Sequence, residues 1–386
     1  MAFAVYIHFP YCLSKCPYCD FASQATAVPH ARYARAIARE LALREREWRG
    51  RRAASLYLGG GTPSLWEPSA LAEALDALRG QTPFAPDAEL TIEANPGASD
   101  AARFRAYRAL GFNRLSIGVQ SFDETSLKAL GRRHSGPDAE RAFASAREAG
   151  FANVSLDLIY GAPGQTVEGA RDDAARAARL APEHLSVYGL MIEGLEIETP
   201  LARQVRRGQI EVPDDEAQWQ MGEQIRAVLE RGGYRRYEIS NWARPGFESR
   251  HNSMYWLGGE YLGLGCGAVG FALEDPLDPS KGGRRWGNHR SPARYLEAVE
   301  AGASPEDWSE RLEAHALLRE RLAIGLRRVA GVDIEAVCAE LRQDPEPSLR
   351  AARRLVERGL ATLDGGLLRL TDRGLDFHTE AAVSFV

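Results

Sequence analysis

The strongest constraint on the fold is an alternation of short apolar segments with longer segments of helical composition in the first half of the chain. The apolar segments are rich in β-branched and aromatic residues, which is typical of buried strands. They are residues 3–9, 55–58, 89–94, 114–119, 153–159 and 184–190. Strands that alternate with helices of roughly 10–20 residues predict an α/β fold with a parallel sheet and right-handed crossovers.

Glycine and polar residues recur where these strands end. Three glycines and a threonine occupy residues 59–62, Glu93 and Gln120 stand at the ends of the next two strands, and Asp157 lies within the fifth. In α/β barrels the loops at the carboxyl ends of the strands share one mouth and carry the site. Six such units are too few for a closed eight-stranded barrel. A partial barrel and a doubly wound open sheet both agree with this pattern.

Three cysteines follow the first strand in a C-x3-C-x2-C spacing, at Cys12, Cys16 and Cys19. Three thiolates bind three corners of a [4Fe–4S] cluster, whose full thiolate set is four, and leave one iron open for a small ligand. Zinc is an alternative, although a closed structural zinc site needs four protein ligands. Three buried cysteines without a metal are the remaining alternative.

The stretch from Tyr6 to Phe21, YIHFPYC…CPYCDF, resembles the radical S-adenosylmethionine (SAM) superfamily and its coproporphyrinogen-oxidase-like branch. In that superfamily SAM chelates the open iron through its amino and carboxylate groups. One electron then cleaves the sulfonium to methionine and a 5′-deoxyadenosyl radical. The resemblance implies that Cys12, Cys16 and Cys19 hold a [4Fe–4S] cluster. It also implies a partial (β/α)6 barrel with an α+β extension and a winged-helix-like C-terminal domain.

The same resemblance implies a set of residues that contact SAM. They are Tyr6, Tyr18, Gly60, Gly61, Thr62, Glu93, Gln120, Arg132 and Asp157. Glycines let the backbone approach a ligand without a Cβ clash, and SAM, which is cationic at sulfur, needs a carboxylate nearby. Without the resemblance, the glycines form a tight turn and Arg132 is a surface residue.

The sequence pattern changes after Pro213 and predicts three regions. Residues 1–232 form the partial barrel, residues 233–309 an irregular extension, and residues 310–386 the winged-helix-like domain. In the last region, helices precede an apolar–turn–apolar hairpin around residues 364–366. Arginines on its third helix, at positions 350, 353, 354 and 358, indicate a solvated face rather than a DNA-reading helix.

Three features separate the oxidase branch from its HemW-type haem-chaperone sister branch. The oxidase motif has a further cysteine where this chain has Phe21, and an N-terminal extension where only five residues precede Tyr6. The string HNSMYW, from His251 to Trp256, resembles the chaperone branch. Imidazole is a common axial ligand of haem iron and aromatic rings stack on flat rings, so the resemblance implies haem contact at His251. From the residues alone, His251 caps a loop and the aromatic rings fill core.

Together, the motifs and this resemblance predict a haem chaperone that binds a [4Fe–4S] cluster, SAM and haem, and delivers haem to a recipient apo-haem protein. The main alternative is oxygen-independent coproporphyrinogen III dehydrogenase, in which propionates are converted to vinyl groups. A radical SAM enzyme with another substrate and a DNA-binding regulator are further alternatives. Cys266 is a weaker candidate ligand, and Lys281, Arg284, Arg285 and Arg290 are candidate partners of propionates.

Composition limits the partners and the compartment. The net charge of −5 argues against nucleic-acid binding. The five cysteines do not form a disulfide framework, which indicates a reducing compartment. No apolar run approaches the roughly 18 residues of a membrane span. We expect a soluble cytoplasmic protein with a reductant such as flavodoxin or ferredoxin, while transient membrane contact and a homodimer stay open.

Overall fold

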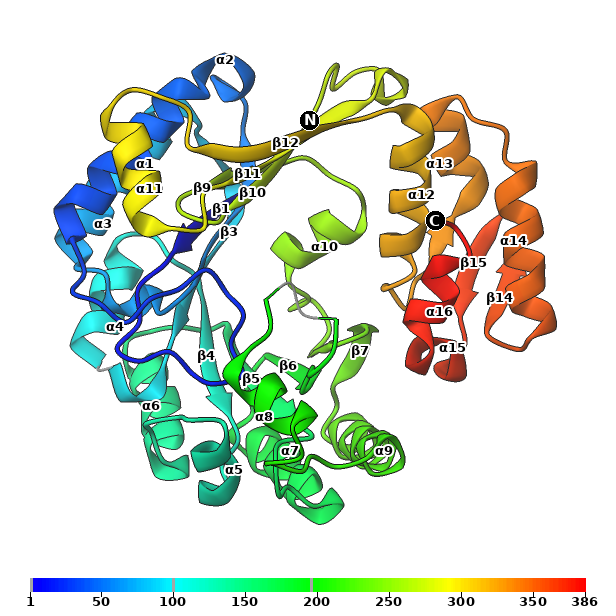
Figure 1. Cartoon of the computed structure of the whole chain (residues 1–386), viewed down its shortest axis with the longest axis horizontal. Coiled ribbons are helices and arrows are strands. Elements are labelled where there is room, and N and C mark those ends of the chain that lie inside the picture. Colours follow the sequence, from blue (N-terminus) through cyan, green and yellow to red (C-terminus); the bar gives the residue numbers. More distant parts are fainter. Residues whose placement is uncertain (1–2, 99–100, 195–196) are drawn as a thin grey trace.

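The computed structural model describes residues 3–98, 101–194 and 197–386 (Figure 1). Its main element is a twelve-stranded sheet with the order β12-β11-β10-β9-β1-β2-β3-β4-β5-β6-β8-β7, and a second sheet has the order β13-β15-β14. The first six strands are β1 (Phe3–Phe9), β2 (Ala53–Gly60), β3 (Phe84–Ala94), β4 (Arg114–Gln120), β5 (Val154–Tyr160) and β6 (His184–Gly189). The later strands are β7 (Arg235–Glu238), β8 (Asn241–Ala243), β9 (Tyr261–Leu264), β10 (Val269–Leu273), β11 (Gly283–Asn288), β12 (Glu306–Leu312), β13 (Val332–Asp333), β14 (Ala361–Asp364) and β15 (Leu367–Leu370).

Strands β1 to β6 are parallel and lie in sequence order, so the six predicted strands and the partial barrel are confirmed. A doubly wound sheet would reverse its strand order at a switch point. The helices of this half are α1 (His30–Leu43), α2 (Glu45–Trp48), α3 (Pro68–Gln81), α4 (Ala101–Ala109), α5 (Glu124–Ala129), α6 (Gly136–Glu148), α7 (Val167–Leu180), α8 (Pro200–Arg206) and α9 (Asp215–Arg231). Figure 1 shows α1, α3, α4 and α6 around the outside of these strands.

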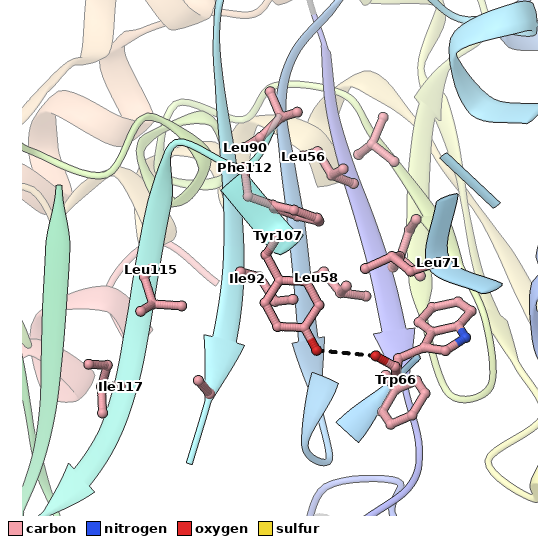
Figure 2. Close-up of a cluster of buried hydrophobic side chains, with 14 of the residues drawn as sticks. Leu56, Leu58, Trp66, Leu71, Leu90, Ile92, Tyr107, Phe112, Leu115 and Ile117 are labelled. Atoms are coloured by element: carbon pink, nitrogen blue, oxygen red, sulfur yellow. Dashed lines mark hydrogen bonds between the residues drawn. The ribbon is translucent and has the colours of Figure 1, made fainter. Parts of the chain in front are cut away.

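The side chains of the barrel strands alternate in character because successive residues point to opposite faces. Leu56 and Leu58 of β2 and Ile92 of β3 pack in the buried outer layer, where the hydroxyl of Tyr107 donates to the carbonyl of Trp66 at 3.1 Å (Figure 2). The intervening positions, such as Tyr57, carry polar groups toward the barrel interior. The same pleat therefore builds both the apolar core and a polar interior.

The sequence predicts an irregular segment over residues 233–309, but the structure shows regular elements there: β7 to β12, α10 (Arg250–Trp256) and α11 (Pro292–Glu300). Strands β8 and β7 extend the sheet beyond β6, and β9 pairs in parallel with β1. These strands were not predicted because they contain glycines, which in a sequence usually indicate turns. A Cβ at Gly270 would overlap the ring of Trp286, so glycine here makes room for a ring rather than a turn.

The C-terminal region contains α12 (Ala314–Gly325), α13 (Ile334–Leu341), α14 (Glu346–Glu357), α15 (Asp372–Asp376) and α16 (His378–Val383). The order α12-β13-α13-α14-β14-β15 is that of a winged helix. Asp364 pairs with Leu367, which leaves Gly365 and Gly366 as a two-residue hairpin turn with φ values of 51° and 84°. The predicted hairpin is therefore confirmed.

The predicted boundary between residues 309 and 310 falls inside β12. Phe271 of β10 also belongs to the apolar cluster of the C-terminal domain, so the two regions share core. The three-part division stays a prediction. Among the described residues, no helix combines the length and apolarity that crossing a membrane requires.

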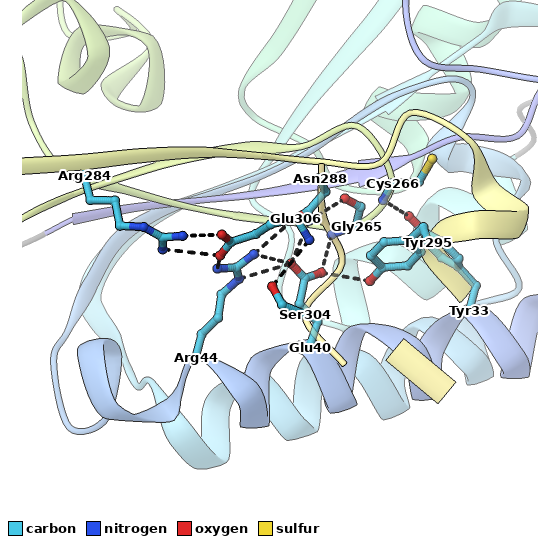
Figure 3. A network of polar contacts seen from close by, with 10 residues as sticks. All are labelled: Tyr33, Glu40, Arg44, Gly265, Cys266, Arg284, Asn288, Tyr295, Ser304 and Glu306. Carbon is cyan, nitrogen blue, oxygen red and sulfur yellow. Dashed lines mark hydrogen bonds and ion pairs between the residues drawn. The ribbon is translucent and has the colours of Figure 1, made fainter. Parts of the chain in front are cut away.

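A buried carboxylate fixes α1 against the extension (Figure 3). Glu40, which is fully buried, accepts hydrogen bonds from Asn288 at 2.7 Å, the Gly265 amide at 2.8 Å and the Tyr295 hydroxyl at 2.8 Å. Arg44 pairs with the same carboxylate at 3.1 Å. These contacts hold the turn that contains Gly265 next to the strand that leads into the cysteines.

Candidate functional site

The carboxyl ends of the barrel strands surround a cavity of about 620 Å³, here called the mouth cavity. This volume suits a small-molecule ligand. The mouth cavity is lined by the predicted cysteines and by eight of the nine predicted SAM contacts: Cys12, Cys16, Cys19, Tyr18, Gly60, Gly61, Thr62, Glu93, Gln120, Arg132 and Asp157. The ninth, Tyr6, lines a neighbouring cavity. The roles of these residues as ligands stay predictions.

The cysteine loop is held by backbone hydrogen bonds to distant segments. The amide of Cys12 donates to the carbonyl of Gln24 at 3.0 Å, and the amide of Leu201 in α8 donates to the carbonyl of Pro17 at 2.9 Å. Burial raises the pKa of both the Cys12 and the Cys19 thiol. Because of this raised pKa, the two thiols are protonated when no metal is bound. Metal ligation requires the thiolate, so they lose their protons when a metal binds.

Arg132 lies beside the cysteine loop, whereas Arg133 is exposed. One Nη of Arg132 is 3.7 Å from Sγ of Cys16, and the other donates to Oδ1 of Asn95 at 2.5 Å and to the carbonyl of Gly118 at 2.8 Å. Arg133 also lines the mouth cavity, but it is Arg132 that contacts Cys16.

The glycine turn after β2 lies directly against the cysteine loop. The amide of Gly61 donates to the carbonyl of Phe9 at 2.7 Å, and a Cβ at Gly61 would lie 2.7 Å from the carbonyl oxygen of Tyr11. Gly60 has a φ of +113°, and its Cβ would lie 2.5 Å from Cε1 of His8. Glycine is therefore required here by the chain itself, in addition to any ligand.

Glu93 and Asp157 place two half-buried carboxyl groups on the wall of the mouth cavity. Glu93 accepts from the Tyr57 hydroxyl at 2.8 Å and the Gly60 amide at 3.1 Å. Burial raises the pKa of Glu93 to about 7, and the nearby Asp157 charge adds to this rise. Burial also raises the pKa of Asp157, although the Ser116 hydroxyl at 3.0 Å opposes the rise. A cationic ligand suits this pair because it offsets the cost of burying negative charge.

A second cavity of about 460 Å³, here called the side cavity, adjoins the first. It is lined by Tyr6, His8, His251, Tyr255, Tyr261 and Arg290 among others. The two cavities share Asp20, Phe21, Tyr57 and Asn252 as lining residues. Phe21, which stands where the oxidase branch has a cysteine, is 58% exposed and lines both.

His251 is buried near the N-terminus of α10, whose first amides donate to Glu89 of β3. Its Nδ1 is 2.9 Å from the Ser55 hydroxyl and its Nε2 is 3.1 Å from the Tyr255 hydroxyl. Burial lowers the pKa of His251 to about 3, so the imidazole is neutral at pH 7. The Trp256 ring packs under Arg327 at 4.4 Å and so serves the contact with the C-terminal domain.

The weaker candidates lie in three different environments. Cys266 is fully buried in the main core. Lys281 and Arg285 form ion pairs with Asp275 and Glu310, at 2.7 and 3.1 Å. Arg284 pairs with Glu306. Arg290 lines the side cavity and donates to the carbonyl of Asp20 at 2.6 Å.

Sequence reasoning missed several residues that line the cavities. Tyr57, Asn95, Arg114 and Asn252 all line the mouth cavity. The period-two alternation of a strand gives a signal for Tyr57, because it lies between the outward-facing Leu56 and Leu58. Asn252 lies within the string HNSMYW, but its place at the mouth cavity follows from the position of α10 in the fold, which the string does not reveal.

The sequence matches two family models, the radical SAM superfamily over residues 6–205 and the HemN C-terminal domain over residues 312–377. It is 44% identical to the heme chaperone HemW of Escherichia coli over 69% of each chain. It is 37% identical to the heme chaperone HemW of Mycobacterium tuberculosis, over 96% of this chain and 92% of the relative. A bovine mitochondrial protein, radical S-adenosyl methionine domain-containing protein 1, is 36% identical over 96% of this chain and 84% of its own.

Among solved structures, coproporphyrinogen III oxidase (HemN) from Escherichia coli superposes with a TM-score of 0.83. It covers all of this chain and 90% of its own, at 24% identity, and so supports the fold. The superfamily model covers the cysteine loop, the glycine turn and both carboxyls, and the match to the relative from Mycobacterium tuberculosis covers 96% of the chain. The chain therefore belongs to the radical SAM superfamily and, within it, to the HemW family.

Proposed function

We propose that this protein is a haem chaperone that holds a [4Fe–4S] cluster on Cys12, Cys16 and Cys19, binds SAM in the mouth cavity and delivers haem to a recipient haem protein. The observation that carries the proposal is that the cysteine loop and the half-buried carboxyls Glu93 and Asp157 line one cavity. We infer haem as the cargo from the relatives named heme chaperones, of which the one from Mycobacterium tuberculosis matches 96% of this chain.

The residues present fit SAM by charge and by space. The carboxyls of Glu93 and Asp157 suit the ammonium and sulfonium charges, and Gly60 and Gly61 keep the turn beside the cysteine loop free of side chains. When bound, the cluster supplies an open iron for SAM and a single electron. One Nη of Arg132 lies 3.7 Å from Sγ of Cys16 and so places a cation beside the proposed cluster.

For haem, we propose the side cavity and His251. A neutral imidazole is the form that ligates iron, and burial keeps His251 neutral. Its Nε2 is hydrogen-bonded to the Tyr255 hydroxyl, so ligation through this nitrogen requires that hydroxyl to turn away. Arg290 at the cavity wall is a cation of the kind that pairs with a propionate.

The electron donor, a second copy of the chain and a membrane surface are also proposed partners. A cluster that is reduced by one electron needs a donor such as flavodoxin or ferredoxin, and the cysteine loop presents Leu13, 62% exposed, on its surface. A homodimer and transient membrane contact stay predictions.

One experiment separates this proposal from coproporphyrinogen III dehydrogenation. The anaerobically reconstituted protein is given haem in one assay, and coproporphyrinogen III with SAM and a reductant in another. We expect stable haem uptake and transfer to an apo-haem protein. Formation of protoporphyrinogen would favour the dehydrogenase instead.

A further inference from the structure

Gln120, at the end of β4, has a backbone conformation that its residue type disfavours. Its φ is +65°, and the amide of Ser121 donates to the carbonyl of Val119 at 2.8 Å across it. A hydrogen bond from residue i+2 to residue i around a positive φ defines the rare, strained form of the γ-turn. A residue other than glycine keeps such a conformation only where its surroundings enforce it.

The turn aims the Gln120 side chain into the mouth cavity. A Cβ at Gly118 would lie 3.0 Å from Nε2 of Gln120 and 3.1 Å from Oδ1 of Asn95. The amide of Gln120 is therefore folded back over Gly118, beside the groups that also contact Arg132. An extended residue at this position would continue the strand and direct the side chain elsewhere.

Asp173 of α7 holds the residues that follow the turn in place through hydrogen bonds. It is only 6% exposed, and its carboxylate accepts from the Ser121 hydroxyl at 2.6 Å and from the Phe122 amide at 2.8 Å. The side chain of Gln165 donates to it at 3.2 Å, and Gln165 in turn accepts from the Gly161 amide at 2.8 Å. One carboxylate thus joins the loops that follow β4 and β5.

We propose that Asp173 is a positioning residue for SAM binding: it holds the strained turn that presents Gln120 to the mouth cavity. Asp173 is not a lining residue of that cavity, so its effect on SAM passes through the turn. This inference rests on the proposed SAM site. It adds Asp173, which is not one of the nine predicted SAM contacts, as a residue that SAM binding requires.

The binding arm of the test measures the SAM dissociation constant of the cluster-loaded protein. We expect Asp173→Asn and Ser121→Ala each to raise it by roughly tenfold, the scale of losing a strained loop conformation, with the cluster absorbance unchanged. Asp172→Ala is the matched control, because Asp172 is the neighbouring residue on α7 and its side chain is 70% exposed. Its SAM affinity should equal that of the parent. Unchanged affinity in both test variants would overturn the proposal.

The second arm measures thermal stability without SAM. It therefore tests whether Asp173 holds the turn independently of whether the protein binds SAM. Glycine adopts φ = +65° without strain, so Gln120→Gly removes the need for Asp173 to enforce the turn. The loss of Tm caused by Asp173→Asn should be at most about half as large in the Gln120→Gly background as in the parent. Equal losses in both backgrounds would overturn the proposal even if SAM binds. If the parent fails to bind SAM, the proposed function fails, and this cycle still decides whether Asp173 holds the turn.

Discussion

The amide of Gly60 donates a 3.1 Å hydrogen bond to Oε2 of Glu93, which joins the glycine turn to the carboxyl of the next strand. The bond makes the protonation of Glu93 part of the geometry of the turn. Burial raises the pKa of this carboxyl to about 7, so Glu93 changes charge within the physiological range.

We predict that SAM affinity rises with pH from about 6 to 8, by up to about tenfold per pH unit below the pKa. Protonated Glu93 is neutral and attracts a cationic ligand less than the carboxylate does. Calorimetric titration of SAM across this range measures the slope. Glu93→Gln should bind SAM weakly with a flatter profile, and an unchanged profile in this variant would contradict the role of Glu93.

The same pKa has a second consequence, for the ligand-free protein. A carboxyl whose pKa is raised in the folded state favours folding when protonated, so its contribution to stability is lost as pH rises from 4.5 to about 7. Glu93→Gln should remove this part of the pH dependence of Tm.

Gly61→Ala should destabilise the protein, because the added methyl meets the carbonyl oxygens of Tyr11 and Phe9. We expect a loss on the order of 1–3 kcal/mol in unfolding free energy and weaker SAM binding. Gly80→Ala is the control: the space around Gly80 is open and it lies in α3, so alanine should stabilise by up to about 1 kcal/mol. Denaturant titration of both variants tests the difference in sign.

Serine at Cys12, Cys16 or Cys19 should abolish the [4Fe–4S] absorbance after anaerobic reconstitution, since each thiolate holds one iron. Cys338→Ala is the control, because Cys338 is buried in the cluster of the C-terminal domain. It should retain full absorbance. A serine variant at any of the three positions with full absorbance would remove that cysteine from the ligand set.

His251→Ala should weaken haem binding and shift the Soret band, because the imidazole is the proposed axial ligand. Tyr255→Phe should act in the opposite direction, since it removes the hydroxyl that lies 3.1 Å from Nε2. Haem titrations of the two variants test this pair. An unchanged Soret band and affinity in His251→Ala would exclude His251 as the ligand.

Glu40→Ala should cost on the order of 3–5 kcal/mol of unfolding free energy, because it leaves several buried donors without an acceptor and removes one of the two carboxylates that pair with Arg44. Glu45→Ala removes an exposed pair with Arg49 and should cost less than about 1 kcal/mol. Equal losses in the two variants would show that the network around Glu40 contributes little.

The barrel was predictable because its signal is local. Apolar strands such as residues 55–58 and 114–119 end at glycines or polar groups, and parallel strands bring those ends to one mouth. The cysteine spacing added a second local signal. Together they identified residues that the fold gathers around a single cavity.

The extension and the finer geometry of the site were not predictable, for two physical reasons. Glycines such as Gly270 stand in strands where they accommodate the tryptophan of a neighbouring strand, and glycine in a sequence otherwise indicates a turn. The positive φ of Gln120 depends on Asp173, 53 residues further along the chain. No window of local sequence contains both residues.

Strand β1 is hydrogen-bonded on both sides, by β2 and by β9. The region that matches the radical SAM model ends at residue 205, before β9 begins. In a fragment that ends at residue 205, β1 would be an exposed edge strand, and its unpaired backbone groups could pair with other chains. The region that matches the family model is therefore shorter than the region that the sheet needs in order to fold. A truncated protein meant to isolate the cysteine-containing half needs to retain Tyr261–Leu264.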